Sequence, residues 1–230
     1  IADYPIFGTI ANINAFALGA KMINPRARVY LEWSTLKDVD IRLAMENVQK
    51  KGVTVVSGKD MVIPEDASRY FGLYHLTEEG PHNLAMPLWH WGKFYEQLIR
   101  TIMDGTWKYD DNKDETKAIN YWWGLSANVL DVILGSSIPE NTCRLIRFLK
   151  SSIANGSFTI FSGILYDNEH TMRCGENEAL TPEDVMMMDW LIEGIEGEIP
   201  TIDQLSDHAK DLVRLRGLKQ TLSEGERQLV

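Results

Sequence analysis

The sequence predicts an α/β fold in which a parallel sheet is covered by helices on both faces. Between residues 4 and 76, short apolar segments of strand length alternate with longer segments whose apolar residues recur at helical spacing. The connections are short, and strands joined through helices commonly pair in parallel. Val53–Val56 (VTVV) is almost wholly apolar, as is typical of a strand buried on both faces.

Four strands and three helices are expected in this first part. The strands are Tyr4–Ile10, Arg28–Trp33, Val53–Val56 and Phe71–Leu76. The helices are Asn12–Met22, Leu36–Lys51 with Ser34 and Thr35 as its cap, and a short stretch that begins at Asp66. Asn24-Pro25 and Gly52 follow the first two helices and end them.

The residues from Asn83 to Trp107 predict a strand that turns directly into a helix. Pro87 keeps the chain extended before it, and Trp89 and Trp91 alternate as on a strand. The apolar period then becomes helical until Gly105 stops the helix. Two indoles at such a junction can offer flat faces to a small planar ligand, and the competing interpretation is that both fill the core.

The remainder predicts further short strands and amphipathic helices. The expected elements are a strand Val129–Leu134, a helix from Pro139 to Ile153, an extended segment Phe158–Leu165, a helix from Thr181 to Ile195 and a helical stretch Leu205–Leu218. We expect residues 1–88 to form one lobe, residues 89–200 to cross over and return to another lobe, and residues 201–230 to form a charged helical tail.

Composition and motifs exclude several function classes. The 230 residues carry a net charge of −10, which argues against nucleic acid as a partner because phosphate binding needs clustered Lys and Arg. Two cysteines are too few for a disulfide framework. The sequence lacks the common nucleotide, hydrolase and metalloprotease motifs, so we expect no catalytic residue, metal or cofactor.

The carboxyl ends of the predicted strands give the candidate binding residues, because ligands of open parallel sheets bind outside those ends. With the two tryptophans they form a polar and aromatic rim. The candidates are Ser34, Ser57, Asp60, Tyr74, His75, Trp89 and Trp91.

Several motifs in collinear order resemble the basic membrane lipoprotein (BMP) family, the PnrA-like substrate-binding proteins of ABC transporters. They are Asn14–Ala20 followed by Asn24-Pro25, Trp89–Tyr95, Asp104–Trp107 and Met188–Trp190, within a similarity that runs from about Tyr4 to about Pro200. The resemblance implies a type I periplasmic-binding-protein fold, with two lobes that close on a purine base or nucleoside. It also implies that the N-terminal part of the first lobe is absent, that the protein is lipid-anchored outside the cytoplasm, and that an ABC transporter permease is its partner.

Carried over by position, the resemblance places four of the candidates at positions of the family's ligand site. Asp60 lies in a ligand-facing loop, and Trp89 falls where members have a Lys or, in purine-base binders, a Trp. Tyr74-His75 falls where many members have an Asp that grips the ribose. The segment Trp33–Asp38 lacks the aromatic residue expected to stack on the base and has Leu36 instead. These departures favour a free base or another small planar molecule over a nucleoside.

Three functions are compared. The first is non-catalytic binding of a purine-like ligand for uptake, in which Trp89 or Trp91 stacks on the ring. The second is a ligand-sensing regulatory domain of a larger cytoplasmic protein, and the sequence upstream of Ile1 distinguishes it from the first. The third, a nucleoside hydrolase-like enzyme, needs a carboxylate cluster where only Asp60 can be placed. Exposed sheet edge and apolar surface also predict self-association.

Overall fold

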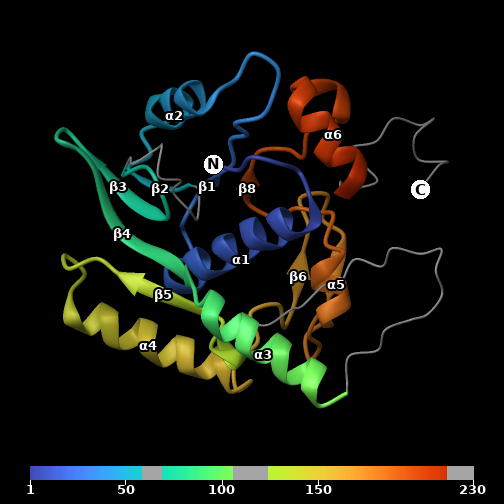
Figure 1. Cartoon of the computed structure of the whole chain (residues 1–230). Coiled ribbons are helices and arrows are strands. Elements are labelled where there is room, and N and C mark those ends of the chain that lie inside the picture. Colours follow the sequence, from blue (N-terminus) through green and yellow to red (C-terminus); the bar gives the residue numbers. More distant parts are fainter. Residues whose placement is uncertain (59–68, 106–123, 217–230) are drawn as a thin grey trace. The chain divides into compact units, whose positions relative to one another are not determined.

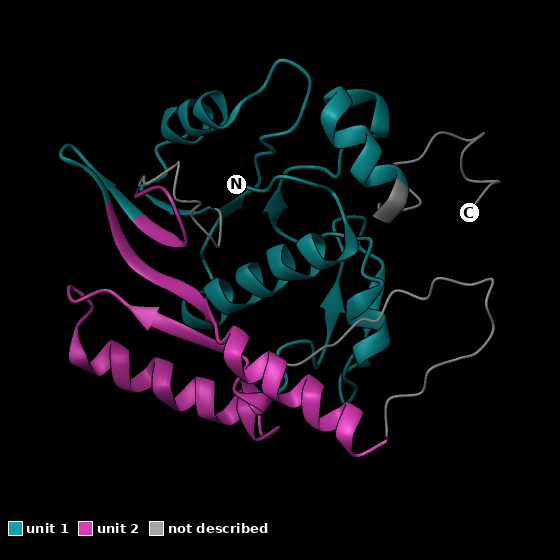
Figure 2. Ribbon diagram, in the orientation of Figure 1, with its two compact units in different colours: residues 1–59, 75–81, 159–230 teal, residues 60–74, 82–158 magenta. Residues whose placement is uncertain are grey.

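The computed structural model describes residues 1–58, 69–105 and 124–216 and has a mixed α/β fold, as expected (Figure 1). The chain forms two compact units (Figure 2). Unit 1 consists of residues 1–59, 75–81 and 159–230, and unit 2 of residues 60–74 and 82–158. The expected domain boundaries at residues 88 and 200 stay a prediction.

Unit 1 contains both ends of the chain. Its described elements are α1 (Phe7–Ile23), β1 (Val29–Tyr30), α2 (Ile41–Lys50), β2 (Val55–Ser57), β6 (Leu165–Tyr166), β7 (Met172–Cys174), α5 (Pro182–Met186), β8 (Ile195–Glu196), the 3-10 turn η2 (Ile202–Gln204) and α6 (Asp207–Arg216). Strand β1 pairs in parallel with β8, and β6 pairs antiparallel with β7.

The core of unit 1 is built from segments that are far apart in the sequence. Ile10 and Ala17 of α1 are fully buried among apolar side chains of β1 and of the segment around Met188–Ile195. Asn14 lies between them on the same helix and is also fully buried. Its amide donates to the Trp190 carbonyl at 2.7 Å and its Oδ1 accepts the Ile192 N–H at 2.9 Å. Asn14 therefore joins α1 to the C-terminal segment.

Unit 2 contains the helices α3 and α4. Its elements are most of β4 (Gly80–Trp89), α3 (Trp91–Met103), the 3-10 turn η1 (Leu125–Ala127), β5 (Leu130–Leu134), α4 (Glu140–Ala154) and the start of β3 (Leu73–Thr77). These strands belong to a four-stranded sheet of order β2-β3-β4-β5, of which β2 and the end of β3 are part of unit 1. Gly72 precedes β3 at φ +59°, and a Cβ there would lie 2.5 Å from the Ala85 carbonyl oxygen, so only glycine allows this approach to β4.

The described sheets contain antiparallel pairs beside the expected parallel pairing, which β1 and β8 show. Strands β4 and β5 are antiparallel, with Ala85 opposite Leu134 and Trp89 opposite Leu130. A helical connection is necessary for parallel pairing but does not impose it. Strands β3 and β4 are joined by only two residues, Glu78 and Glu79, as in a β-hairpin. This hairpin was not among the expected elements.

Two N-terminal expectations are corrected as well. Residues expected as the strand Tyr4–Ile10 begin helix α1 at Phe7, because a short apolar run does not by itself distinguish a strand from a helix segment. Helix α2 starts at Ile41 rather than Leu36, and Asp40 caps it by accepting the Leu43 N–H at 2.8 Å. The expected caps Ser34 and Thr35 donate their hydroxyls to Asp3 instead.

The C-terminal half follows the expectation in part. Helix α4 begins one residue after Pro139 and ends at Ala154, and Thr181 caps α5 with Pro182 in its first turn, as predicted. Helix α5 ends at Met186, short of Ile195. The residues that follow it are held elsewhere, because Ile192 binds Asn14 and Ile195 pairs with β1 as part of β8. Of the expected extended segment Phe158–Leu165, only Leu165 lies in a strand. The helical stretch expected from Asp66 lies outside the described residues.

Candidate functional site

An exposed aromatic pair lies where β4 becomes α3. Trp89 is the last residue of β4 and Trp91 is the first of α3. Their rings are stacked, with centroids 5.9 Å apart and planes at 20° to each other. The two residues remain 38% and 50% exposed. The interpretation of both tryptophans as core residues is therefore excluded in this structure.

Backbone hydrogen bonds fix the position of this pair. Trp89 is held by its antiparallel pairing with Leu130, and the next N–H, that of His90, donates to the Val129 carbonyl at 2.8 Å. The His90 carbonyl then accepts the Phe94 N–H at 3.1 Å, which starts the helix. Strand and helix thus meet through one residue, and the indoles on either side of it are brought together.

Phe94 extends the aromatic surface. Its ring meets that of Trp91 edge-on, with centroids 6.0 Å apart and planes at 79°. Edge-to-face contact at this distance is favourable and holds the Trp91 indole in place. The helical period after Trp91 predicts only that Phe94 lies in the helix. The spacing of three residues from Trp91, which sets both on one helical face, is the signal for this contact.

A group of charged side chains lies on the other face of the same strand pair. Leu88 is opposite Asp131, so these two share one face while Trp89 and Leu130 share the other. Asp131 binds the Lys150 ammonium at 2.7 Å, and His90 Nε2 lies 3.9 Å from its second oxygen. Lys150, then the Val132 N–H, hold the pKa of Asp131 below its usual value. These charges are thus separate from the stacked indoles.

Two of the predicted residues of unit 1, Ser34 and Ser57, bond to the first residues of the sequence. The Ser57 carbonyl at the end of β2 accepts the N-terminal ammonium of Ile1 at 2.8 Å. The Ser34 hydroxyl donates to Asp3 Oδ1, and its N–H to the Ala2 carbonyl at 2.9 Å. His75 is half-buried in β3. Ser34 and Ser57 therefore take part in holding the N-terminal residues.

The other predicted residues belong to unit 2. Tyr74 is 1% exposed, burial raises the pKa of its hydroxyl to about 12, and its ring meets that of Tyr70 edge-on. In this conformation Tyr74 packs inside the unit. Asp60 lies outside the described residues. Within unit 2, the structure therefore brings Trp89 and Trp91 together as an accessible surface.

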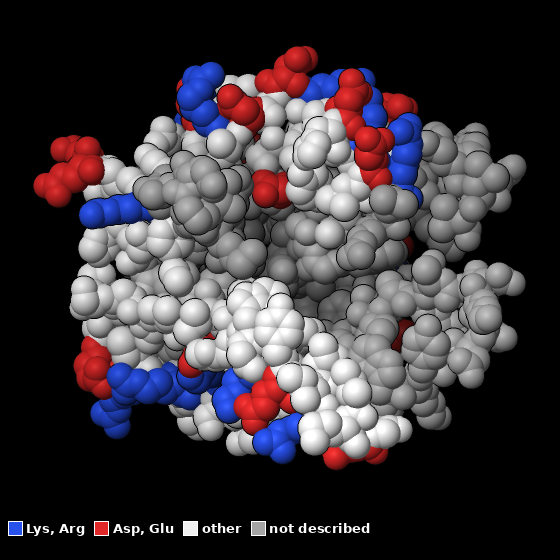
Figure 3. All heavy atoms as spheres, viewed as in Figure 1, with Lys and Arg blue, Asp and Glu red and all other residues white. Residues whose placement is uncertain are grey.

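The expected absence of a nucleic-acid partner stays a prediction. On the face seen in Figure 3, Lys and Arg side chains lie next to Asp and Glu side chains along the upper and lower parts of the picture. Among the described residues there is no group of three His, Cys, Asp or Glu side chains that could hold a metal ion. Nor is any described helix long and apolar enough to span a membrane.

Comparison with known proteins adds two distant relatives. No family model matches the chain. It is 24% identical over 213 residues to a putative ABC transporter glucose-binding protein, TsgA13, of Haloferax volcanii, which covers 87% of this chain and 49% of that protein. It is 21% identical over 213 residues to a purine-binding protein of Brucella abortus, which covers 87% of this chain and 57% of that protein. The chain thus spans about half the length of these relatives, and both are named as binding proteins.

Proposed function

We propose that this chain belongs to a non-catalytic protein that binds a purine base or nucleoside, with Trp89 and Trp91 as the surface on which the ring stacks. The observation that carries the proposal is the exposed, stacked indole pair fixed at the β4–α3 junction. A purine is flat and aromatic, and stacking on an indole requires only a free face of the tryptophan ring. The half-exposed state of both residues supplies accessible surface for such contact.

Stacking alone gives a modest affinity. Base–aromatic stacking contributes about 1–3 kcal/mol per base, whereas micromolar binding corresponds to roughly 8 kcal/mol. Hydrogen bonds to the polar edge of the ring are therefore needed as well. Our candidates for these contacts remain Ser34, Ser57, Asp60, Tyr74 and His75, whose roles are predictions from sequence position and family resemblance. For Tyr74 the role requires a change from its buried conformation.

The relatives support this class of function. The name of the Brucella protein specifies purine binding, and the name of the Haloferax protein places it with an ABC transporter. We extend the proposal accordingly: the whole protein is a BMP-type, PnrA-like substrate-binding lipoprotein, anchored outside the cytoplasm, that delivers its ligand to an ABC transporter permease.

The binding proposal is tested by calorimetric titration with purine bases and nucleosides. The measurement should be made on this chain and on the protein extended to the length of its relatives. We expect saturable binding of one of these compounds, and Trp89→Ala to weaken it by about 1–3 kcal/mol, or roughly 5- to 150-fold in Kd.

Phe148→Ala is the matched control for this titration. Phe148 is an aromatic residue of unit 2 that is 66% exposed on α4, away from the stacked pair in sequence. It should leave the Kd unchanged. Equal losses in both variants, or no purine binding by the extended protein, would contradict the proposal.

The name of the Haloferax relative favours a sugar as the second candidate ligand. A sugar ring can lie with its C–H groups against an indole, so Trp89 could serve either ligand. Glucose in the same titration distinguishes them. Saturable binding of glucose with no response to any purine would replace the purine proposal and keep the aromatic surface.

A further inference from the structure

The aromatic side chains at the β4–α3 junction form a continuous row of rings. Trp89 stacks on Trp91, and Trp91 meets Phe94 edge-on. Phe94 in turn meets Tyr95 edge-on, with centroids 5.6 Å apart and planes at 76°. Trp89 is the last residue of β4, whereas the other three belong to the start of α3. The row therefore connects the strand residue to the helix through side chains as well as through the backbone.

The stacked indoles leave no room for a ligand ring between them. A flat ring inserted between two others keeps about 3.5 Å from each, so the outer rings would be about 7 Å apart. The centroids of Trp89 and Trp91 are only 5.9 Å apart. In this arrangement a purine can use only an outer face of the pair, so it contacts one indole while the other lies behind.

The ring contacts of the two indoles differ. Trp91 lies in the middle of the row and touches the rings of both Trp89 and Phe94. Among the residues that the structure describes, Trp91 is the one whose ring contacts that of Trp89. Of the two stacked indoles, Trp89 is thus at the end of the row, and it is 38% exposed. Within that part of the chain, the outer face without an aromatic neighbour is therefore that of Trp89.

We propose that Trp89 supplies the face on which the purine stacks, and that Trp91 and Phe94 are positioning residues that hold its indole without touching the ligand. This inference rests on the proposed function and assigns separate roles within it. Immobilising a side chain on binding weakens a complex by roughly 2- to 12-fold in Kd. Because Trp91 and Phe94 fix the Trp89 indole beforehand, the complex avoids that loss.

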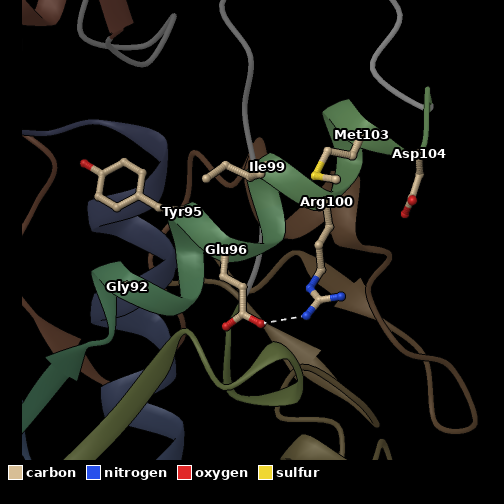
Figure 4. A pocket seen from close by; sticks show the side chains of 7 residues that line it. All are labelled: Gly92, Tyr95, Glu96, Ile99, Arg100, Met103 and Asp104. Carbon is tan, nitrogen blue, oxygen red and sulfur yellow. Dashed lines mark hydrogen bonds and ion pairs between the residues drawn. The ribbon is translucent and has the colours of Figure 1, made fainter.

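Figure 4 shows how the neighbouring side chains of α3 lie. Tyr95, the last ring of the row, is on one side of the helix. Glu96 is on the other side, where its carboxylate binds Arg100 at 3.0 Å. These charges therefore bind each other and take no part in the row of rings. Ile99 lies farther along the helix, outside the row, and supplies a control variant on the same element.

Fluorine NMR of the full chain labelled with 5-fluorotryptophan tests the positioning role without ligand. The chain contains seven tryptophans, and loss of a signal in Trp89→Phe or Trp91→Phe identifies the two resonances. Phe94→Ala should shift both, because Trp91 loses the edge contact that holds it and Trp89 rests on Trp91. Ile99→Ala should leave both unchanged. A Trp89 resonance that Phe94→Ala does not move would overturn the positioning role of Phe94.

Adenine and adenosine, added to the labelled chain and to the protein extended to the length of its relatives, test which indole contacts the ligand. Contact with a purine should shift the Trp89 resonance and reduce the difference in its position between H2O and D2O, which reports exposure to solvent. The Trp91 resonance should change less, and the reverse pattern would overturn the assignment. If neither compound binds, the purine function fails, and the spectra without ligand still decide whether Phe94 holds the indole pair.

Affinities measured by calorimetry then separate positioning from contact. Phe94→Ala should weaken purine binding by about 2- to 12-fold, less than the loss of roughly 5- to 150-fold expected for Trp89→Ala. Phe94→Tyr keeps the ring and its edge contact, so it should restore the affinity of the unchanged chain. Ile99→Ala should leave the Kd unchanged. Equal affinities of Phe94→Tyr and Phe94→Ala, with far-UV circular dichroism showing that both are folded, would refute the role of the Phe94 ring.

Discussion

Helices α1 and α3 each have an apolar side, but their surroundings differ. Helix α1 buries Ile10, Asn14 and Ala17 completely among segments from both ends of the chain. Helix α3 has no buried residue among those described, and four large side chains of its apolar face are more than half exposed. An amphipathic pattern therefore predicts that a helix forms and which side is apolar, but not what covers that side.

The largest expected effect comes from a matched pair of isoleucines. Ile10→Ala should destabilise unit 1 by about 2–5 kcal/mol, because it removes buried apolar volume and leaves a cavity. Ile99→Ala, at a residue 54% exposed, should change the stability of the monomer by about 0.5 kcal/mol or less. Urea unfolding at low protein concentration measures both. Equal losses of stability in the two variants would show that the two helices do not differ in burial.

A smaller effect is expected from Asn14→Ala. The substitution leaves the Ile192 N–H buried without its partner, at about 1–3 kcal/mol. The Trp190 carbonyl also loses a partner, but it is only partly buried. Asn12→Ala on the exposed side of the same helix is the control and should be nearly neutral. Urea unfolding again supplies the comparison, and a neutral Asn14→Ala would show that α1 is held by apolar packing alone.

The smallest effect is the change that the Tyr74 hydroxyl causes in the free energy of unfolding for each pH unit. It tests whether Tyr74 is buried in unit 2. Its folded pKa of about 12 lies above the ordinary value of 10, so the folded chain holds this proton more tightly than the unfolded chain. The resulting stability is complete below pH 10 and is lost as the pH rises toward 12, by up to about 1.4 kcal/mol per pH unit. Tyr74→Phe should remove this part of the slope. An unchanged slope would mean that Tyr74 is accessible to solvent.

Local patterns in the sequence predicted the elements that local interactions determine. The change of period between Trp89 and Trp91 located the β4–α3 junction, and Thr181-Pro182 located the start of α5. Ser34 and Thr35 were good cap residues by type, but their hydroxyls bind Asp3, some 30 residues away. Such a distant partner leaves no trace in the neighbouring sequence.

The candidate site also combines features that depend on neighbouring residues with features that depend on distant ones. The proximity of the two indoles could be predicted, because both tryptophans lie within three residues of each other. Their exposure could not, because the same pattern also suits two core residues. The position of Asp131 on the opposite face could not, because it depends on the register between β4 and β5. A shift of one residue in that register would bring Asp131 to the face of Trp89. The burial of Tyr74 likewise depends on packing across β3.

Asn14 has a consequence for the order in which the chain becomes structured during synthesis. The backbone group that completes its hydrogen bonds, the Ile192 N–H, lies 178 residues further along the chain. At the usual rate of elongation, roughly 10–35 s pass between the synthesis of these two residues. Residues 82–158 of unit 2 are made within that interval as one continuous segment, so they can fold while α1 still has its apolar side exposed. Helix α1 is thus made well before the segment that buries it.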